Sequence, residues 1–261
     1  MRRVIRTAAV GVLLLPAYAL FAYVVMPVSW RQYHRLRGLP AAYRATRTAE
    51  GISADPLNVA LVGTAQDVEV AMRAAGWCPA DRISIRAGIR DAASVVFHRP
   101  YPSAPMSTHL LWGRPQDLAF EQIVDGSPRK RHHVRLWRVN RPADPHGTVW
   151  LGAASYDRSV GLSSYTGEVV HHIDRRVDEE REKLLTDLRR AGRVLRIDRE
   201  ERWIPRGPSR NGSGDVYETD GRICVAVLGD PSVERRVPPP EEILQVLKES
   251  IARSWTLEAA R

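Results

Sequence analysis

The chain has 261 residues, of which 44% are hydrophobic and 26% are charged, and this composition is that of a folded protein. Its length suits one domain of roughly 200 residues preceded by a short N-terminal segment. Residues 1–50 carry eight arginines and one acidic residue, and therefore account for +7 of the formal charge of +9. The net charge of +2 on residues 51–261 excludes the concentrated basic face that nucleic-acid binding requires. The two cysteines, Cys78 and Cys224, form no CxxC or Cys/His spacing, which excludes a disulfide framework and a zinc knuckle but leaves one bridge open.

The first element in chain order is an uncharged apolar run over residues 7–30. As a helix rising about 1.5 Å per residue it reaches about 36 Å, more than the roughly 30 Å hydrocarbon core of a bilayer. The run therefore predicts a single-pass transmembrane anchor within residues 1–30. The alternative is a cleaved signal peptide, because Ala17-Tyr18-Ala19 resembles a cleavage site, although the apolar run continues past it. Arginines on both sides of the run leave the membrane side of the following domain open.

Residues 31–54 are expected to form a basic juxtamembrane connector, and residues 55–261 one folded domain. After the connector, residues 57–63 predict a short buried strand, and Thr64 with Asp67 predicts a capped helix through residue 75. A second amphipathic helix is indicated by four apolar residues at helical spacing: Ile85, Ile89, Ala92 and Val96.

A series of strands follows these helices. The predicted strands are residues 109–113, 117–124, 131–139, 148–156, 168–173, 194–197 and 223–228. Helices are predicted over residues 177–191 and from residue 238 onward, with a loop at residues 205–214 and a hairpin turn at residues 219–222. Helices at both ends with consecutive strands between them predict an α+β fold with one mostly antiparallel sheet and flanking helices.

The first concentration of polar side chains is the segment Arg-His-His-Val-Arg-Leu-Trp at residues 131–137. Because side chains alternate along a strand, His133, Arg135 and Trp137 are expected to share one face. An imidazole and a guanidinium suit an anion, and the indole would shield it from water. The alternative is a half-exposed sheet face on which Trp137 packs against Arg135 without a ligand. Arg114, in a Gly-Arg-Pro junction at the sheet rim, is a further candidate for ligand binding.

The second concentration is a His-His-Ile-Asp segment that leads into the predicted helix at residue 177. His172 and Asp174 fall on one side of a strand about 6.6 Å apart at Cα, so they are candidates for binding one metal ion or for a general base oriented by its acid. With His133 and Asp178 they form the predicted metal set, and Arg181 is a candidate ligand-binding residue. The alternative is helix capping, since carboxylates at a helix start complement its dipole. The chain contains no H-E-x-x-H, G-x-S-x-G or Gly-rich phosphate motif that would decide between these interpretations.

Several segments together resemble the LssY C-terminal domain family. The matching segments are residues 55–63, 75–77, 113–120, 131–137, 149–155 and 171–181. They follow the family order over roughly residues 55–190, and several matches in order are more specific than any one of them. The resemblance places six candidate residues in family motifs: His133, Arg135, Trp137, His172, Asp174 and Asp178.

The resemblance implies a bacterial membrane-associated module without a defined activity. In longer relatives, a similar domain follows membrane-spanning and phosphatidic-acid-phosphatase-like regions. This chain lacks the K-x₆-R-P, P-S-G-H and S-R-x₅-H-x₃-D motifs of such phosphatases, so the resemblance carries no phosphatase activity over to it.

Two functions are consistent with these patterns. The first is a membrane-anchored accessory protein of the cell envelope that binds an anionic partner, a lipid headgroup or an envelope protein. The basic connector, which anionic lipid attracts by roughly 1 kcal/mol per basic residue, and the face of His133 and Arg135 favour it. The second is a metal- or His-dependent hydrolase of a phosphate ester near the membrane, with a divalent metal ion as its cofactor. Both functions require residues 131–137 and 171–174 to face a common cavity.

Overall fold

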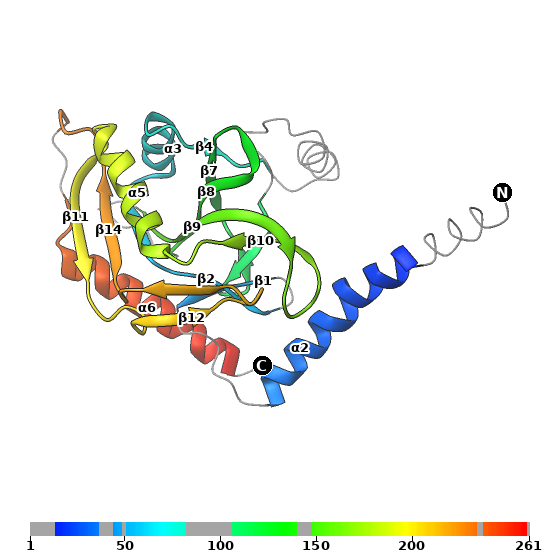
Figure 1. Cartoon of the computed structure of the whole chain (residues 1–261). Helices are drawn as coiled ribbons and strands as arrows, with labels where there is room; N and C mark the ends of the chain where they lie inside the picture. The colour runs from blue at the N-terminus through cyan, green and yellow to red at the C-terminus, as the bar shows by residue number, and fades with distance from the viewer. Residues whose placement is uncertain are drawn as a thin grey trace.

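The computed structural model describes residues 14–36, 44–48, 51–81, 106–139, 148–233 and 237–259, and a large sheet forms its centre (Figure 1). In spatial order the strands of this sheet are β11 (Val194–Glu200), β14 (Ile223–Leu228), β3 (Val59–Val62), β9 (Val149–Leu162), β8 (Ser127–Arg138), β7 (Leu118–Val124) and β4 (Cys78–Pro79), and β10 (Val169–Ile173) also pairs with β9. Within this described sheet only β14 and β3 are parallel neighbours. The predicted α+β fold with a mostly antiparallel sheet is confirmed.

Two smaller sheets complete the strands of the described chain. One has the order β2 (Ser53–Pro56), β1 (Ala45–Thr48), β5 (His109–Leu111) and β6 (Arg114–Pro115). The other is the hairpin of β12 (Gly207–Arg210) and β13 (Val216–Thr219). Strands β1 and β2 therefore occupy part of the expected connector at residues 31–54, and β12 lies within the expected loop at residues 205–214.

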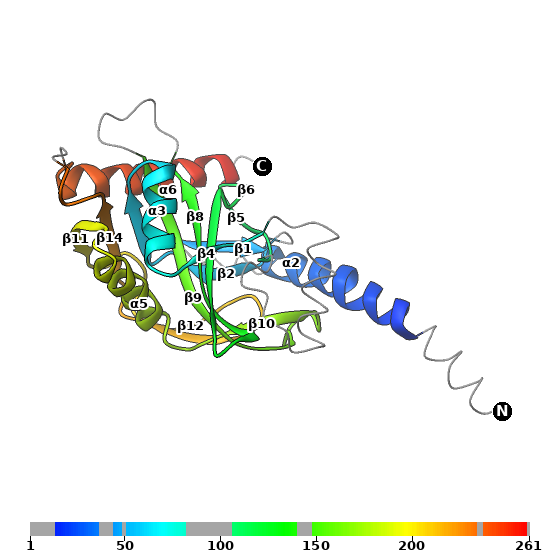
Figure 2. The same ribbon diagram turned by 90° about the horizontal axis from the view of Figure 1, so that it is seen from above.

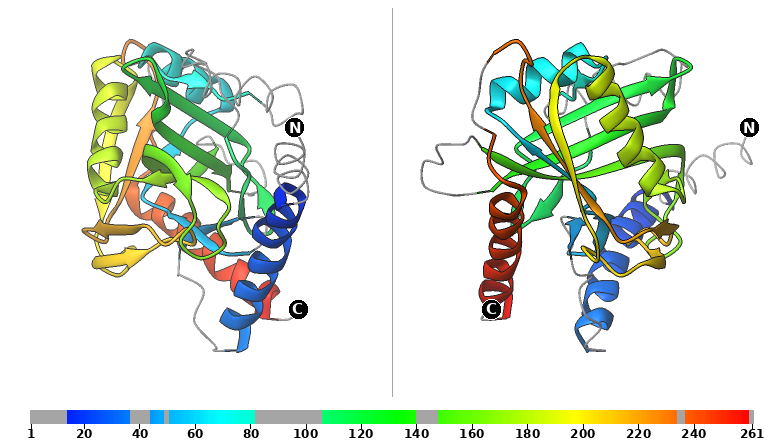
Figure 3. Two further views of the ribbon diagram at one scale, coloured as in Figure 1. Left: turned by 45° about the vertical axis from the view of Figure 1, so that its right-hand side comes forward. Right: turned by 90° about the vertical axis from the view of Figure 1, so that its left-hand side faces the viewer.

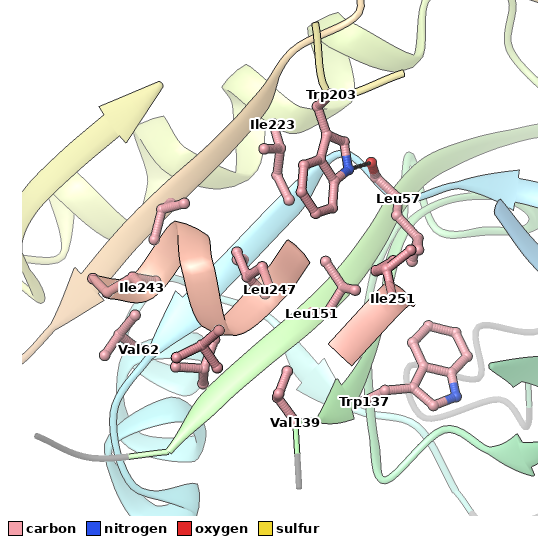
Figure 4. Close-up of a cluster of buried hydrophobic side chains, with 14 of the residues drawn as sticks. Leu57, Val62, Trp137, Val139, Leu151, Trp203, Ile223, Ile243, Leu247 and Ile251 are labelled. Atoms are coloured by element: carbon pink, nitrogen blue, oxygen red, sulfur yellow. Dashed lines mark hydrogen bonds between the residues drawn. The ribbon is translucent and has the colours of Figure 1, made fainter. Parts of the chain in front are cut away.

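Helices cover both faces of the large sheet, because side chains of its central strands alternate between two apolar cores. Helices α3 (Ala65–Ala74) and α5 (Val177–Arg190) pack on one face against residues such as Leu61 and Leu136. Helix α6 (Pro240–Ala259) packs on the other face against residues such as Val62 and Leu151 (Figure 2). The second core also holds Trp203, whose indole N–H donates to the Leu57 carbonyl oxygen at 2.9 Å (Figure 4).

The local signals that predicted α3 act as expected. The Thr64 hydroxyl accepts a hydrogen bond from the Asp67 N–H at 3.1 Å, and the Asp67 carboxylate accepts one from the Thr64 N–H at 2.8 Å. This capping box satisfies two backbone N–H groups at the helix start. The helix predicted from Ile85 to Val96 lies outside the described residues.

The N-terminal helix lies beside the β9–β10 hairpin (Figures 1 and 3). It is helical over residues 14–20, continues through the π-helical turn η1 (Phe21–Val25) and ends with α2 (Met26–Leu36). The Tyr18 hydroxyl donates to the Gly167 carbonyl oxygen at 2.6 Å, and the Tyr23 hydroxyl accepts from the Val169 N–H at 3.0 Å. The transmembrane helix predicted over residues 7–30 is not confirmed: in the part of the chain that the structure describes, no helix is long and apolar enough to span a membrane.

Candidate functional site

A polar cavity of about 320 Å³ lies where the smaller four-stranded sheet meets β8, β9 and β10. Its wall also includes Tyr23 of the N-terminal helix and the turn at residues 211–213 between β12 and β13. Ionisable side chains from five different strands line it: Asp55, His109, Arg131, His133, Arg135, Asp157 and His171. The described structure thus concentrates charge where a globular protein usually buries apolar groups.

The alternation of β8 places three of these side chains in the cavity. Arg131, His133 and Arg135 are 3%, 1% and 3% exposed, while the intervening Val134 and Leu136 enter the core beneath α3 and α5. The Trp137 side chain points to the same face of β8 as His133 and Arg135. It lies farther along the strand, where α6 covers the sheet, and is buried in the apolar core beneath α6. The predicted shared face of His133 and Arg135 is confirmed, and the position of Trp137 in the core removes it from the cavity wall.

His133 lies between two carboxylates. Its Nδ1 is 3.4 Å from Asp157 Oδ2 and its Nε2 is 3.5 Å from Asp55 Oδ2. Neither ring nitrogen has a hydrogen-bond partner with acceptable geometry among the described residues. A buried polar group in this condition points to an additional partner, such as a ligand or an ordered water molecule.

The two arginines pair with the same carboxylates and hold them in place. Arg135 Nη1 donates to Asp55 Oδ2 at 2.8 Å, and Arg131 Nε donates to Asp157 Oδ2 at 2.9 Å. Arg131 Nη1 also donates to the buried Glu121 at 2.9 Å. These charge-assisted hydrogen bonds offset the cost of burying each ion, so the cavity wall is preorganised.

Electrostatics keep the imidazole of His133 charged. Burial by itself would lower the pKa of His133, but the charge of Asp157 raises it above its ordinary value. Burial would likewise raise the pKa of Asp157 and Asp55, but the neighbouring cationic groups lower both. The two carboxylates therefore favour the imidazolium form of His133.

The other two histidines of the cavity are neutral. Burial and, to a smaller extent, the charge of Arg135 lower the pKa of His109 to about 3, against the opposing effect of Asp55. Burial also lowers the pKa of His171 to about 4, against the opposing effect of Asp157. The cavity thus presents one charged and two neutral imidazoles, a combination that favours different proton-transfer roles.

The structure does not bring His172 to the cavity. A β-bulge in β9 pairs Ser159 with His172 but Asp157 with Ile173, which leaves Arg158 as the extra residue. Consequently His171 and Ile173 line the cavity, and His172 Nδ1 instead lies 2.8 Å from Asp215 Oδ1. The Asp215 carboxylate also accepts from the Ile173 N–H at 3.2 Å, so the pair fastens the β12–β13 hairpin to β10.

The remaining predicted residues also lie in ion pairs away from the cavity. Asp174 accepts from the Arg176 N–H at 2.9 Å just before α5, but the N-cap of this helix is Arg176, so the predicted capping role of Asp174 is wrong. Asp178 accepts from Arg181 Nη1 at 2.9 Å. The buried guanidinium of Arg181 also donates to Asp220 at 2.9 Å. Burial by itself would lower the pKa of Arg181, but the hydrogen bond to Asp220 and the charges of Asp178 and Asp220 raise it. Arg114 pairs with Asp117 at 2.6 Å at the sheet rim.

The predicted metal set is therefore not assembled: His133 is separated from His172, Asp174 and Asp178. Over the described residues, no group of three or more His, Cys, Asp or Glu side chains is placed to hold a metal ion. Cys78 is exposed and Cys224 is buried, and both are free thiols.

Sequence reasoning missed five of the cavity residues: Asp55, His109, Arg131, Asp157 and His171. Asp55 opens the first family-like segment, and Asp157 follows the predicted strand at residues 148–156 by one residue. His109 begins a predicted strand. His171 precedes the predicted site residue His172, and because side chains alternate along a strand it faces the opposite side. These positions were visible, but no periodicity connects Asp55 to Arg135, which is 80 residues away.

Comparison with known proteins gives one match. Residues 34–223 match the family described as LssY C-terminus, which is 190 of the 261 residues. The seven ionisable cavity residues on the strands lie within the matched range. No curated protein and no solved structure gives a significant match.

Proposed function

Since the chain belongs to the LssY C-terminus family, we propose that it is a membrane-associated module whose cavity binds an anionic group. The observation that carries this proposal is His133, a buried imidazole that lines the cavity with its ring nitrogens 3.4 and 3.5 Å from Asp157 and Asp55 and without a hydrogen bond of acceptable geometry to either carboxylate. Arg135 lies beside it on the same strand face. An anion oxygen in the cavity would offer His133 a better-aligned acceptor than either carboxylate.

The charges of the wall are suited to a small anion. Asp55, Asp157 and Glu121 balance Arg131, His133 and Arg135, so the wall does not bury uncompensated positive charge. Among the described residues, the hydrogen bonds of Arg135 to Asp55 and Ser107 use three of its five N–H donors. A tetrahedral anion such as phosphate is small enough for a cavity of about 320 Å³.

Titration calorimetry of the full chain with inorganic phosphate tests anion binding. Arg135→Lys keeps the charge but loses the planar fork, and we expect it to weaken phosphate binding by about tenfold or more. Arg129→Lys is the matched control, because Arg129 lies exposed on the same strand and does not line the cavity. Equal affinity in the wild type and the Arg135→Lys variant would contradict the proposal.

Membrane association is supported by the N-terminal segment. Its helix exposes large apolar side chains, including Leu15, Phe21 and Val24. Three arginines, Arg31, Arg35 and Arg37, follow the uncharged run in sequence. Replacing all three with Gln should weaken binding to vesicles of phosphatidylcholine and phosphatidylglycerol by on the order of 100-fold, at roughly 1 kcal/mol per arginine. Unchanged sedimentation with the vesicles would remove the electrostatic part of the proposal.

A second candidate function is acid–base hydrolysis of a phosphate ester in the same cavity. The raised pKa of His133 suits a proton donor, whereas His109 and His171 stay unprotonated and, with pKa values of about 3 and 4, are weak bases. The test is p-nitrophenyl phosphate hydrolysis, which His133→Gln should reduce by about 100-fold while Glu218→Gln, on the distant exposed hairpin strand, leaves it unchanged. Absence of turnover by the wild type leaves anion binding alone.

A further inference from the structure

The cavity reaches the surface at the junction of the N-terminal helix and the β9–β10 hairpin. Tyr23 and Val169 both line the cavity, yet their side chains are 46% and 55% exposed. The Val169 N–H donates to the Tyr23 hydroxyl at 3.0 Å, which joins the two elements at this opening. The rim carboxylate, Glu168, accepts a hydrogen bond from the Thr166 hydroxyl within the hairpin.

Apolar side chains continue outward from this opening. Leu162 is the register partner of Val169 in the hairpin and is 57% exposed. On the helix, Leu20 lies one turn before Tyr23, and both Leu20 and Val24 are exposed. Exposed apolar side chains beside a polar cavity are the arrangement that a ligand with a polar head and a hydrocarbon tail requires.

We propose that the ligand of the cavity is an anionic amphiphile taken from a lipid surface, with its head beside His133 and Arg135 and its chain along Tyr23, Val169 and Leu162. This inference rests on the proposed anion-binding function and names the class of ligand. Charge favours a lipid over a protein segment as the occupant, because residues 7–30 carry no charge and are followed by Arg31, Arg35 and Arg37. An uncharged apolar helix with a basic end complements an anionic lipid surface.

Two probes with the same head separate the contributions of head and tail. Binding of methyl phosphate and of octyl phosphate, each below its micelle concentration, is measured by calorimetry on the full chain. Burial of the octyl chain should make octyl phosphate bind at least about tenfold more tightly than methyl phosphate. Leu162→Ser should reduce this ratio toward one and leave methyl phosphate binding unchanged, because Leu162 does not line the cavity. Val233→Ser is the control, since Val233 is 61% exposed and does not line the cavity.

The outcomes distinguish this inference from the function on which it rests. If methyl phosphate binds and octyl phosphate binds no more tightly, the amphiphile inference is overturned while anion binding stands. If neither probe binds, both proposals are overturned. If light scattering shows a dimer that octyl phosphate does not dissociate and that Leu162→Ser disrupts, a second copy covers this surface and the amphiphile inference is again overturned.

Discussion

Individual side chains of the cavity titrate in opposite directions because each has a different neighbour. His133 faces Asp157 and keeps its proton, whereas burial removes the proton from His109 and His171. All three are imidazoles in one cavity, so residue type alone does not define their charge. His109 also lies near a carboxylate, with its Nδ1 3.5 Å from Asp55 Oδ2, but burial and the charge of Arg135 outweigh that contact.

These pKa shifts predict a stability maximum near pH 6.5. The folded protein binds fewer protons at His109 and His171 than the unfolded chain, so its free energy of unfolding falls as the pH drops from 6.5 toward their folded pKa values of about 3 and 4. His133 acts in the opposite sense: its contribution is complete below pH 6.5 and is lost as the pH rises through its raised pKa.

Urea unfolding across pH 4.5–8.5 measures this profile. His171→Gln should remove up to about 1.4 kcal/mol per pH unit from the acid slope, and His133→Gln should flatten the alkaline decline. His132→Gln is the control from the other face of β8, where its Nδ1 pairs with Glu180 at 2.7 Å. Slopes identical to the wild type in both cavity variants would contradict the assigned protonation states.

At the scale of elements, the β-bulge of β9 determines the composition of the cavity. The bulge shifts the pairing of β9 with β10 by one residue between His172 and Ile173. Because of this shift, His171 lies on the same side as Asp157 and faces the cavity. His172 then serves as a positioning residue, because its contact with Asp215 holds the β12–β13 hairpin against β10. The turn of that hairpin, with Asn211 and Ser213, forms part of the cavity wall.

Asp215→Ala tests this attachment of the hairpin. It leaves the Ile173 N–H without its acceptor and removes the partner of His172, so we expect the free energy of unfolding to fall by about 1–3 kcal/mol. Phosphate affinity should also fall, because the cavity wall loosens. Glu218→Ala on the same hairpin is the control: its exposed ion pair with Arg175 should contribute at most about 1 kcal/mol. Equal effects of the two substitutions would contradict the positioning role.

At the scale of the whole molecule, one sheet separates two apolar cores. Leu185 of α5 belongs to one core and Leu247 of α6 to the other, and each is at most 2% exposed. The same strands supply both cores through alternating side chains, as Leu61 and Val62 of β3 illustrate. The cavity lies at one end of this double-sided packing, so its wall depends on the integrity of the sheet.

This arrangement predicts a single cooperative unfolding transition. Leu185→Ala and Leu247→Ala should each lower the free energy of unfolding by about 2–5 kcal/mol and shift one common transition. Tryptophan fluorescence and far-UV circular dichroism should give coincident curves in urea. Gln245→Ala on the exposed side of α6 should change stability by at most about 0.5 kcal/mol. Separate transitions in the two core variants would mean that the faces unfold independently.

The sequence by itself determined the type and order of most described elements and the shared face of His133 and Arg135. Those features depend on short-range physics: the Thr64–Asp67 cap, the helical or alternating spacing of apolar residues, and the parity of a strand. Only the tertiary structure decided that Asp55 meets Arg135 across 80 residues and that His171 replaces His172 in the cavity. Strand pairing and a bulge set those contacts, and pairing between distant segments leaves no periodic trace in either segment.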